Sequence, residues 1–210
     1  MAIMEWRGGH AAWEAIPAGA ASSSVDKLPR ALYIHGVQHT GQSLNIAFLT
    51  HEPFYPPSGG GSSEAIYLVE ELVRRGHRVA LFCPKVADPA LVRDRFRATL
   101  HEFTLWKMGR YAALRNFKYV LFPFFLERQV ARVLARERFD VVLSQHAIAA
   151  VTAGRLRRRF GLPTVMNFLD YLTGFMETWP PYVAPPFLLK RLTRFELSVP
   201  QKYQADGVLT

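Results

Sequence analysis

The sequence predicts an α/β domain in which helices cover both faces of a parallel β-sheet. Short apolar runs rich in branched and aromatic residues alternate with longer segments whose apolar residues recur at helical spacing. A strand followed by a helix and a second strand requires a right-handed crossover, which makes neighbouring strands parallel. The chain has 210 residues and half of them are apolar, enough to build one core of this kind.

The first strand is expected at residues 44–50, a short apolar run of the sort that is buried inside parallel sheets. A helix follows, with an apolar stripe, Ser62 or Ser63 as its N-cap, Arg74 in its last turn and Gly76 as its stop. A second strand is expected at 77–83. The alternation then recurs in helices at 128–138, 147–160 and 187–203 and in strands at 139–145, 164–168 and 207–210.

Residues 1–43 are dominated by alanine, glycine and serine and show no sustained apolar period. We expect them to form a disordered tail, although the apolar stretch 31–34 leaves a strand there as an alternative. The domain itself is expected to span 44–210. Because α/β domains rarely finish by starting a strand, the apolar residues from Gly207 onward indicate that this domain is truncated at its C-terminal end.

Several classes of protein are excluded by composition. No uninterrupted apolar run reaches the ~18 residues of a membrane span, and the first 25 residues lack the apolar core of a secretory signal. The single cysteine, Cys83, cannot form an internal disulfide or anchor a cysteine-based zinc site, and no metal site is expected. We therefore expect a cytoplasmic protein.

The net charge of +9 arises in the middle of the chain, where residues 74–159 hold nineteen basic and six acidic groups. Cations alternate with aromatic residues in the segment 106–119, and four of these cations form a candidate anion patch: Lys107, Arg110, Arg115 and Lys118. Such a patch suits the inner face of an anionic membrane or the wall of a substrate cleft. The arginines at 155–159 are expected to form a solvated helix face. No nucleic-acid-binding module is recognisable, so we expect no nucleic-acid partner.

The segment 58–63, Ser-Gly-Gly-Gly-Ser-Ser, is the strongest chemical signal and is expected to be an irregular loop. Backbone amides without side chains at a helix N-terminus bind anions such as phosphate. The dinucleotide fingerprint is incomplete, because Glu64 stands where its third glycine belongs, and the lysine of a P-loop is absent. A plain flexible turn between strand and helix remains the alternative.

The segment 44–84, with its His-Glu-Pro, Tyr-Pro-Pro and glycine-loop motifs, resembles the start of the N-terminal domain of family 4 glycosyltransferases of the GT-B fold. The resemblance continues through Phe-Asp-Val-Val at 139–142, Gly-Leu-Pro-Thr-Val at 161–165 and Ala-Asp-Gly-Val at 205–208. It covers residues 44–210 in order. The order and spacing of these individually weak motifs make the resemblance specific.

The resemblance implies one half of a GT-B fold, a Rossmann-like domain that holds the acceptor while a sugar is transferred from a nucleotide-sugar donor to a glycan or lipid-linked acceptor. The nucleotide sugar is a substrate, and no cofactor is implied. The backbone of Gly59, Gly60 and Gly61 would lie against the donor phosphates, and His146 would face the sugar as the catalytic residue. Its alternative role is an ordinary histidine that closes a strand. The remaining candidates for the cleft are Glu52, Ser62 and Asp170.

The sequence also departs from the family pattern. Ser144 and Leu169 stand where many members have histidine, which bears on acceptor contacts more than on fold. The family's donor motif, two glutamates separated by seven residues, is absent. We therefore expect catalysis to require a C-terminal donor domain in cis or in trans, with this chain inactive alone. Carboxylate spacing rules for glycoside hydrolysis do not transfer to this chemistry, so the stereochemical outcome stays open. The alternative is a non-catalytic domain that binds anionic membrane or a partner through its basic-aromatic patch.

Overall fold

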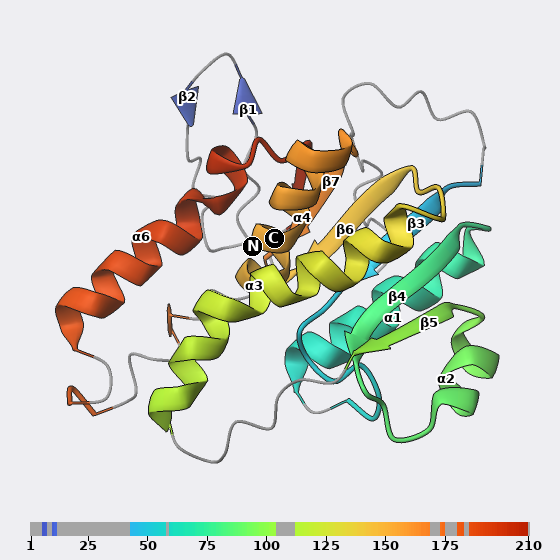
Figure 1. Ribbon diagram of the computed structural model, residues 1–210, viewed down its shortest axis with the longest axis horizontal. Helices are drawn as coiled ribbons and strands as arrows, with labels where there is room; N and C mark the ends of the chain where they lie inside the picture. Colours follow the sequence, from blue (N-terminus) through green and yellow to red (C-terminus); the bar gives the residue numbers. More distant parts are fainter. Residues whose placement is uncertain are drawn as a thin grey trace, which may run out of the picture.

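A six-stranded parallel sheet in the order β5-β4-β3-β6-β7-β8 forms the centre of the computed structural model (Figure 1). Its strands are β3 (Asn45–Leu49), β4 (Arg78–Pro84), β5 (Thr99–Phe103), β6 (Val141–Gln145), β7 (Thr164–Asn167) and β8 (Gly207–Leu209). The structure describes residues 6–7, 10–11, 43–57, 59–103, 112–168, 173–174, 180–182 and 185–209, without the side chains of 6–7, 10–11 and 112–120. Counted along the chain from β3, the strand order is third, second, first, fourth, fifth, sixth, which is the Rossmann order. The predicted fold class is confirmed.

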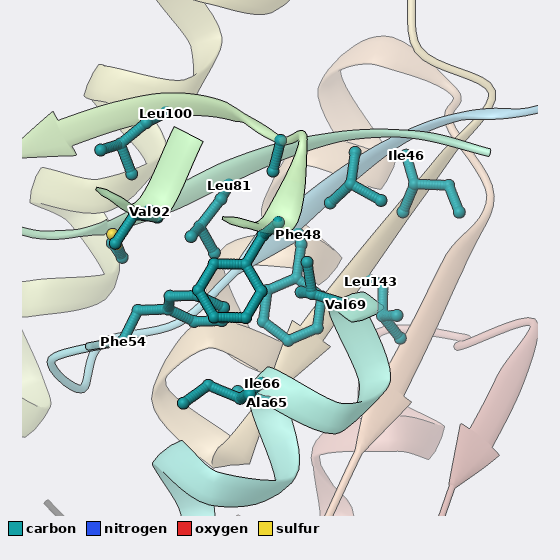
Figure 2. Close-up of a cluster of buried hydrophobic side chains, with 14 of the residues drawn as sticks. Ile46, Phe48, Phe54, Ala65, Ile66, Val69, Leu81, Val92, Leu100 and Leu143 are labelled. Carbon is teal, nitrogen blue, oxygen red and sulfur yellow. The ribbon is translucent and has the colours of Figure 1, made fainter. Parts of the chain in front are cut away.

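Helices cover both faces of this sheet: α1 (Gly60–Arg74), α2 (Pro89–Phe96), α3 (Ala112–Leu134), α4 (His146–Phe160) and α6 (Pro186–Lys202). Successive side chains of β3 point to opposite faces. Phe48 packs with α1 and α2 in one cluster, where Figure 2 shows it beside Val69 of α1. Leu49 packs on the other face with residues of α3 and α4. α6 joins that second face, where Val199 and Tyr203 contact Met166 and Val151.

The start of α1 differs from the prediction. The helix begins at Gly60 with Gly59 as its N-cap, so the segment expected to be irregular supplies its first turn. The Ser62 hydroxyl accepts a hydrogen bond from the Gly59 amide and lies 3.0 Å from the Gly59 carbonyl, which also accepts from the Ser63 hydroxyl. The two serines therefore bond backward to Gly59 from inside the helix instead of standing before it as the N-cap. Gly76, with φ +85°, ends the helix as predicted.

The helix predicted at 128–138 corresponds to the last part of the longer α3, which begins at Ala112, contains Pro123 and ends at Leu134, four residues before the predicted end. Phe122, Leu126 and Val130, spaced four residues apart, are all buried against the sheet, and this apolar stripe continues the helix past the proline. The carbonyl of Pro123 accepts a hydrogen bond of 3.1 Å from Thr152 of α4. α2 and β5 were not predicted, whereas the other predicted helices and strands are confirmed within one or two residues.

Of the predicted tail, the structure describes Trp6–Arg7 (β1) and His10–Ala11 (β2), which pair antiparallel, and Ser43. The alternative strand at 31–34 lies outside the described residues, so the disorder of the tail stays a prediction. Among the helices that are described, none combines the length and hydropathy needed to traverse a bilayer.

Candidate functional site

The candidate site lies at the carboxyl ends of β3 and β6, the two neighbouring strands at which the sheet order reverses. From β3 the chain continues into α1 on one face, and from β6 it continues into α4 on the opposite face. Diverging connections of this kind open a crevice in parallel sheets, and ligands bind there. Glu52 follows β3, His146 follows β6 and the glycines begin α1, so the sequence-predicted residues meet at this point.

His146 occupies the sharp turn between β6 and α4. Its φ of +62° is in the left-handed region, which residues other than glycine rarely adopt. The residue is 4% exposed, and within the described part of the chain neither imidazole nitrogen has a hydrogen-bond partner. A buried polar ring held in a costly backbone conformation is typical of functional sites.

Glu52 faces this imidazole from the segment that follows β3. Its Oε2 lies 3.9 Å from Nε2 of His146, and its side chain is 32% exposed. The Glu52 amide donates a 3.2 Å hydrogen bond to the hydroxyl of Thr50, which is itself buried at the end of β3. The carboxylate thus lies beside the imidazole and remains partly open to solvent.

Gly61 makes the close approach of α1 possible. A Cβ atom there would lie 2.5 Å from Nε2 of His146 and 2.8 Å from Oε2 of Glu52. The Gly61 carbonyl accepts a hydrogen bond from the side chain of Gln145, the last residue of β6. Gln145 therefore holds the first turn of α1 against the strand that carries His146.

Gly59 and Gly60 have open space instead, since a Cβ atom at either would meet nothing within 4 Å. The first amides of α1 have no acceptor within the helix, and the helix dipole adds positive potential at this end. Both glycines are exposed, so this end of the helix is open to an anion. Ser62, by contrast, is 1% exposed, and its hydroxyl accepts a hydrogen bond from the N-cap residue Gly59 from within the first turn of α1.

Three polar residues at this edge were missed by the sequence reasoning. Gln145 and Asn167 end the adjacent strands β6 and β7 opposite each other, and both are buried. Among the described residues, Oε1 of Gln145 and Nδ2 of Asn167 have no hydrogen-bond partner. The His51 ring meets the His146 ring edge to face at 5.8 Å. A polar residue at the end of an apolar strand was the available signal for the two amides, as it was for His146.

The placement of the other predicted site residues stays a prediction. Asp170, Lys107 and Arg110 lie outside the described residues, and Arg115 and Lys118 belong to the part of α3 whose side chains are not described. The one cysteine is no candidate nucleophile, because burial raises the pKa of the Cys83 thiol to about 12. The crevice thus combines an imidazole, a carboxylate and a helix N-terminus, which suit proton transfer beside a bound anion.

Two solved structures share this fold. The calicheamicin glycosyltransferase CalG4 matches with a TM-score of 0.51 and 18% identity, over 79% of this chain and 44% of that one. Sucrose-phosphate synthase from Thermosynechococcus elongatus matches with a TM-score of 0.56 and 14% identity, over 79% of this chain and 41% of that one. The chain therefore spans less than half the length of these structures.

No curated protein matches the sequence. A family model, Glycosyltransferase Family 4, matches residues 58–208, a span that begins just before α1 and ends within β8. The match covers well over half of the chain and the whole of the crevice except the segment after β3. This chain belongs to glycosyltransferase family 4.

Proposed function

We propose that this chain is the acceptor-side domain of a glycosyltransferase that moves a sugar from a nucleotide-sugar donor to an acceptor hydroxyl. The observation that carries the proposal is the convergence of His146, Glu52 and Gly61 at the switch point of the sheet. Since the chain spans less than half of its structural neighbours, we propose that turnover needs a donor-binding domain in cis or in trans.

In the proposed reaction, the acceptor oxygen forms a bond to the anomeric carbon of the donor sugar. The bond between that carbon and the diphosphate oxygen breaks, and the nucleoside diphosphate leaves with the bonding electrons. The hydroxyl proton passes to Nε2 of His146, and Glu52 stabilises the resulting imidazolium. The buried ring without a hydrogen-bond partner among the described residues is the support for this role.

The donor phosphates are proposed to lie against the backbone of Gly59 and Gly60. The unobstructed space at both residues and their position at the start of α1 support this placement. As fixed donors aimed at a leaving diphosphate, these amides would also stabilise the charge that develops when the glycosidic bond breaks.

The test uses the full-length protein that contains this domain, assayed for nucleotide release with a panel of nucleotide sugars and with glycan or lipid-linked acceptors. His146→Asn is the informative variant, because asparagine also tolerates the left-handed backbone but cannot take up the proton. We expect turnover to fall by about 10² or more.

The matched control is His77→Asn, which removes an imidazole at the opposite end of the sheet. Nδ1 of His77 accepts a 3.3 Å hydrogen bond from the Leu44 amide, a bond that the asparagine oxygen can replace. The proposal fails if the two variants turn over at the same rate. It also fails if the folded full-length protein releases no nucleotide with any donor.

A further inference from the structure

The outward face of α3 carries a stripe that changes from apolar to cationic along the helix. The described side chains on this stripe are exposed and recur every three or four residues, at Leu121, Phe124, Arg128 and Arg132. Leu121 is 52% exposed and Phe124 is 53% exposed, whereas Phe122 and Leu126, their neighbours, are buried. The fold therefore leaves two large apolar side chains in solvent directly before two arginines.

α4 adds two more arginines to this face. Arg155 and Arg159 lie one turn apart on α4 and, with the C-terminal part of α3, border a groove of about 530 Å³. The packing of α4 on α3, including the bond from Thr152 to the carbonyl of Pro123, fixes the two walls relative to each other. The groove is lined by Phe124, Glu127, Arg128, Ala131, Arg132, Ala135, Arg155 and Arg159.

Among the described residues, the groove holds more arginines than carboxylates. Its one carboxylate, Glu127, accepts a hydrogen bond from Nε of Arg155, whose guanidinium also lies 4.4 Å from the centre of the Phe124 ring. Arg128, Arg132 and Arg159 form no ion pair within the part of the chain that the structure describes.

The intervening arginines of α4 have structural partners instead. Arg157 forms an ion pair with Asp206, and Arg158 donates a 2.8 Å hydrogen bond to the Lys202 carbonyl. The four arginines of α4 therefore do not form one solvated basic face, as expected, but fall into two pairs with different surroundings. Two arginines attach α4 to the chain near α6, and two face the groove on α3.

We propose that this α3–α4 groove binds the phosphate groups of anionic phospholipids, with Leu121 and Phe124 entering the headgroup layer. Guanidinium groups bind phosphate with matched, paired hydrogen bonds, and a row of them beside exposed apolar side chains suits a lipid surface. A nucleic acid would use the arginines and leave the two apolar side chains in solvent, so the membrane is the better match. The proposal is independent of the transferase reaction.

The test measures co-sedimentation of the full-length protein with vesicles of phosphatidylcholine alone or mixed with phosphatidylglycerol. We expect binding to the mixed vesicles only, weakening as salt is added. Arg128→Glu/Arg132→Glu should lower the partition coefficient by at least about 25-fold, because each of the two lost cations contributes roughly a factor of five near an anionic surface. Equal binding to both vesicles would overturn the proposal.

The matched control is Arg78→Glu/Arg93→Glu, which makes the same charge change at exposed residues of β4 and α2. This control should bind the mixed vesicles much more tightly than Arg128→Glu/Arg132→Glu does. If both double variants lose vesicle binding equally, net charge alone attracts the protein and the proposal fails. Phe124→Ser should weaken vesicle binding without changing its dependence on salt. If Phe124→Ser leaves vesicle binding unchanged while duplex DNA binds in an Arg128-dependent way, the groove is a nucleic-acid site and the proposal fails.

Discussion

Gly61→Ala is the substitution that most directly tests the geometry of the crevice. The added methyl group would lie 2.5 Å from Nε2 of His146, and relieving this overlap to an ordinary contact of 3.4 Å requires a shift of about 0.9 Å. The Oε2 of Glu52, at 2.8 Å, blocks a second direction. His146 cannot easily yield, because it is buried and its backbone is confined to the left-handed region.

The magnitude follows from two opposing effects. Overpacking of a close contact costs about 1–3 kcal/mol, whereas alanine is favoured over glycine inside a helix by about 0.5–1 kcal/mol. Gly60→Ala is the matched control for stability, since its methyl group would meet nothing within 4 Å. We therefore expect Gly61→Ala to have a free energy of unfolding about 1–3 kcal/mol below that of Gly60→Ala.

The assay is urea unfolding of both variants followed by circular dichroism, with the slopes compared to establish that the unfolded states are alike. In the full-length protein a displacement of about 1 Å at His146 should also lower turnover by about 10². Unfolding curves for Gly61→Ala and Gly60→Ala that coincide within about 0.5 kcal/mol would refute the close approach of α1 to His146.

Two further predictions concern the body of the domain. Gly154→Ala would place a methyl group into the ring of Tyr203, so it should separate α4 from α6 and lower the free energy of unfolding by about 3 kcal/mol or more, measured by thermal and urea unfolding; a wild-type midpoint would contradict this packing. Burial raises the pKa of Cys83 to about 12, above its ordinary value of 9.0, so the folded protein holds it as a thiol up to and beyond pH 9, where the unfolded chain ionises. An aromatic disulfide reagent at pH 8 should therefore react with Cys83 only after urea is added, and prompt reaction of the folded protein would refute its burial.

The strands and helices were predictable where the sequence has a clear apolar pattern or a clear signal at the end of an element. The buried residues of β3 are all apolar, β6 begins with the buried apolar residues Val141, Val142 and Leu143, and α4 ends at Gly161, whose φ of +68° suits glycine. α2 and β5 lack such an apolar pattern. In α2 only Val92 and Phe96 are buried, and β5 is an edge strand with exposed polar residues between its buried ones. β5 is formed by its pairing with β4 and not by a local pattern, whereas α2, which packs against α1, does have a local start signal in the N-cap Asp88 followed by Pro89.

The sequence predicted which residues belong to the site better than it predicted the contacts between them. A histidine at the end of an apolar strand identifies His146, because the ends of parallel strands gather at one edge of the sheet. The contact between Gly61 and His146 joins residues that are distant in the sequence and depends on how α1 packs. The role of Ser62 was misjudged for a related reason, since a serine before an apolar stripe suggests an N-cap whether it stands at the cap or within the first turn.

The left-handed backbone of His146 limits which sequences can occupy this corner of the fold. Branched side chains such as valine, isoleucine and threonine clash in that conformation, whereas glycine, asparagine and aspartate accept it. Two requirements therefore restrict the residue types at position 146: the left-handed backbone conformation and the chemistry of the side chain. In a randomised library, variants that merely fold would be confined to a small subset of side chains. If the active variants are restricted further, to histidine, that additional restriction would come from the reaction and not from the backbone.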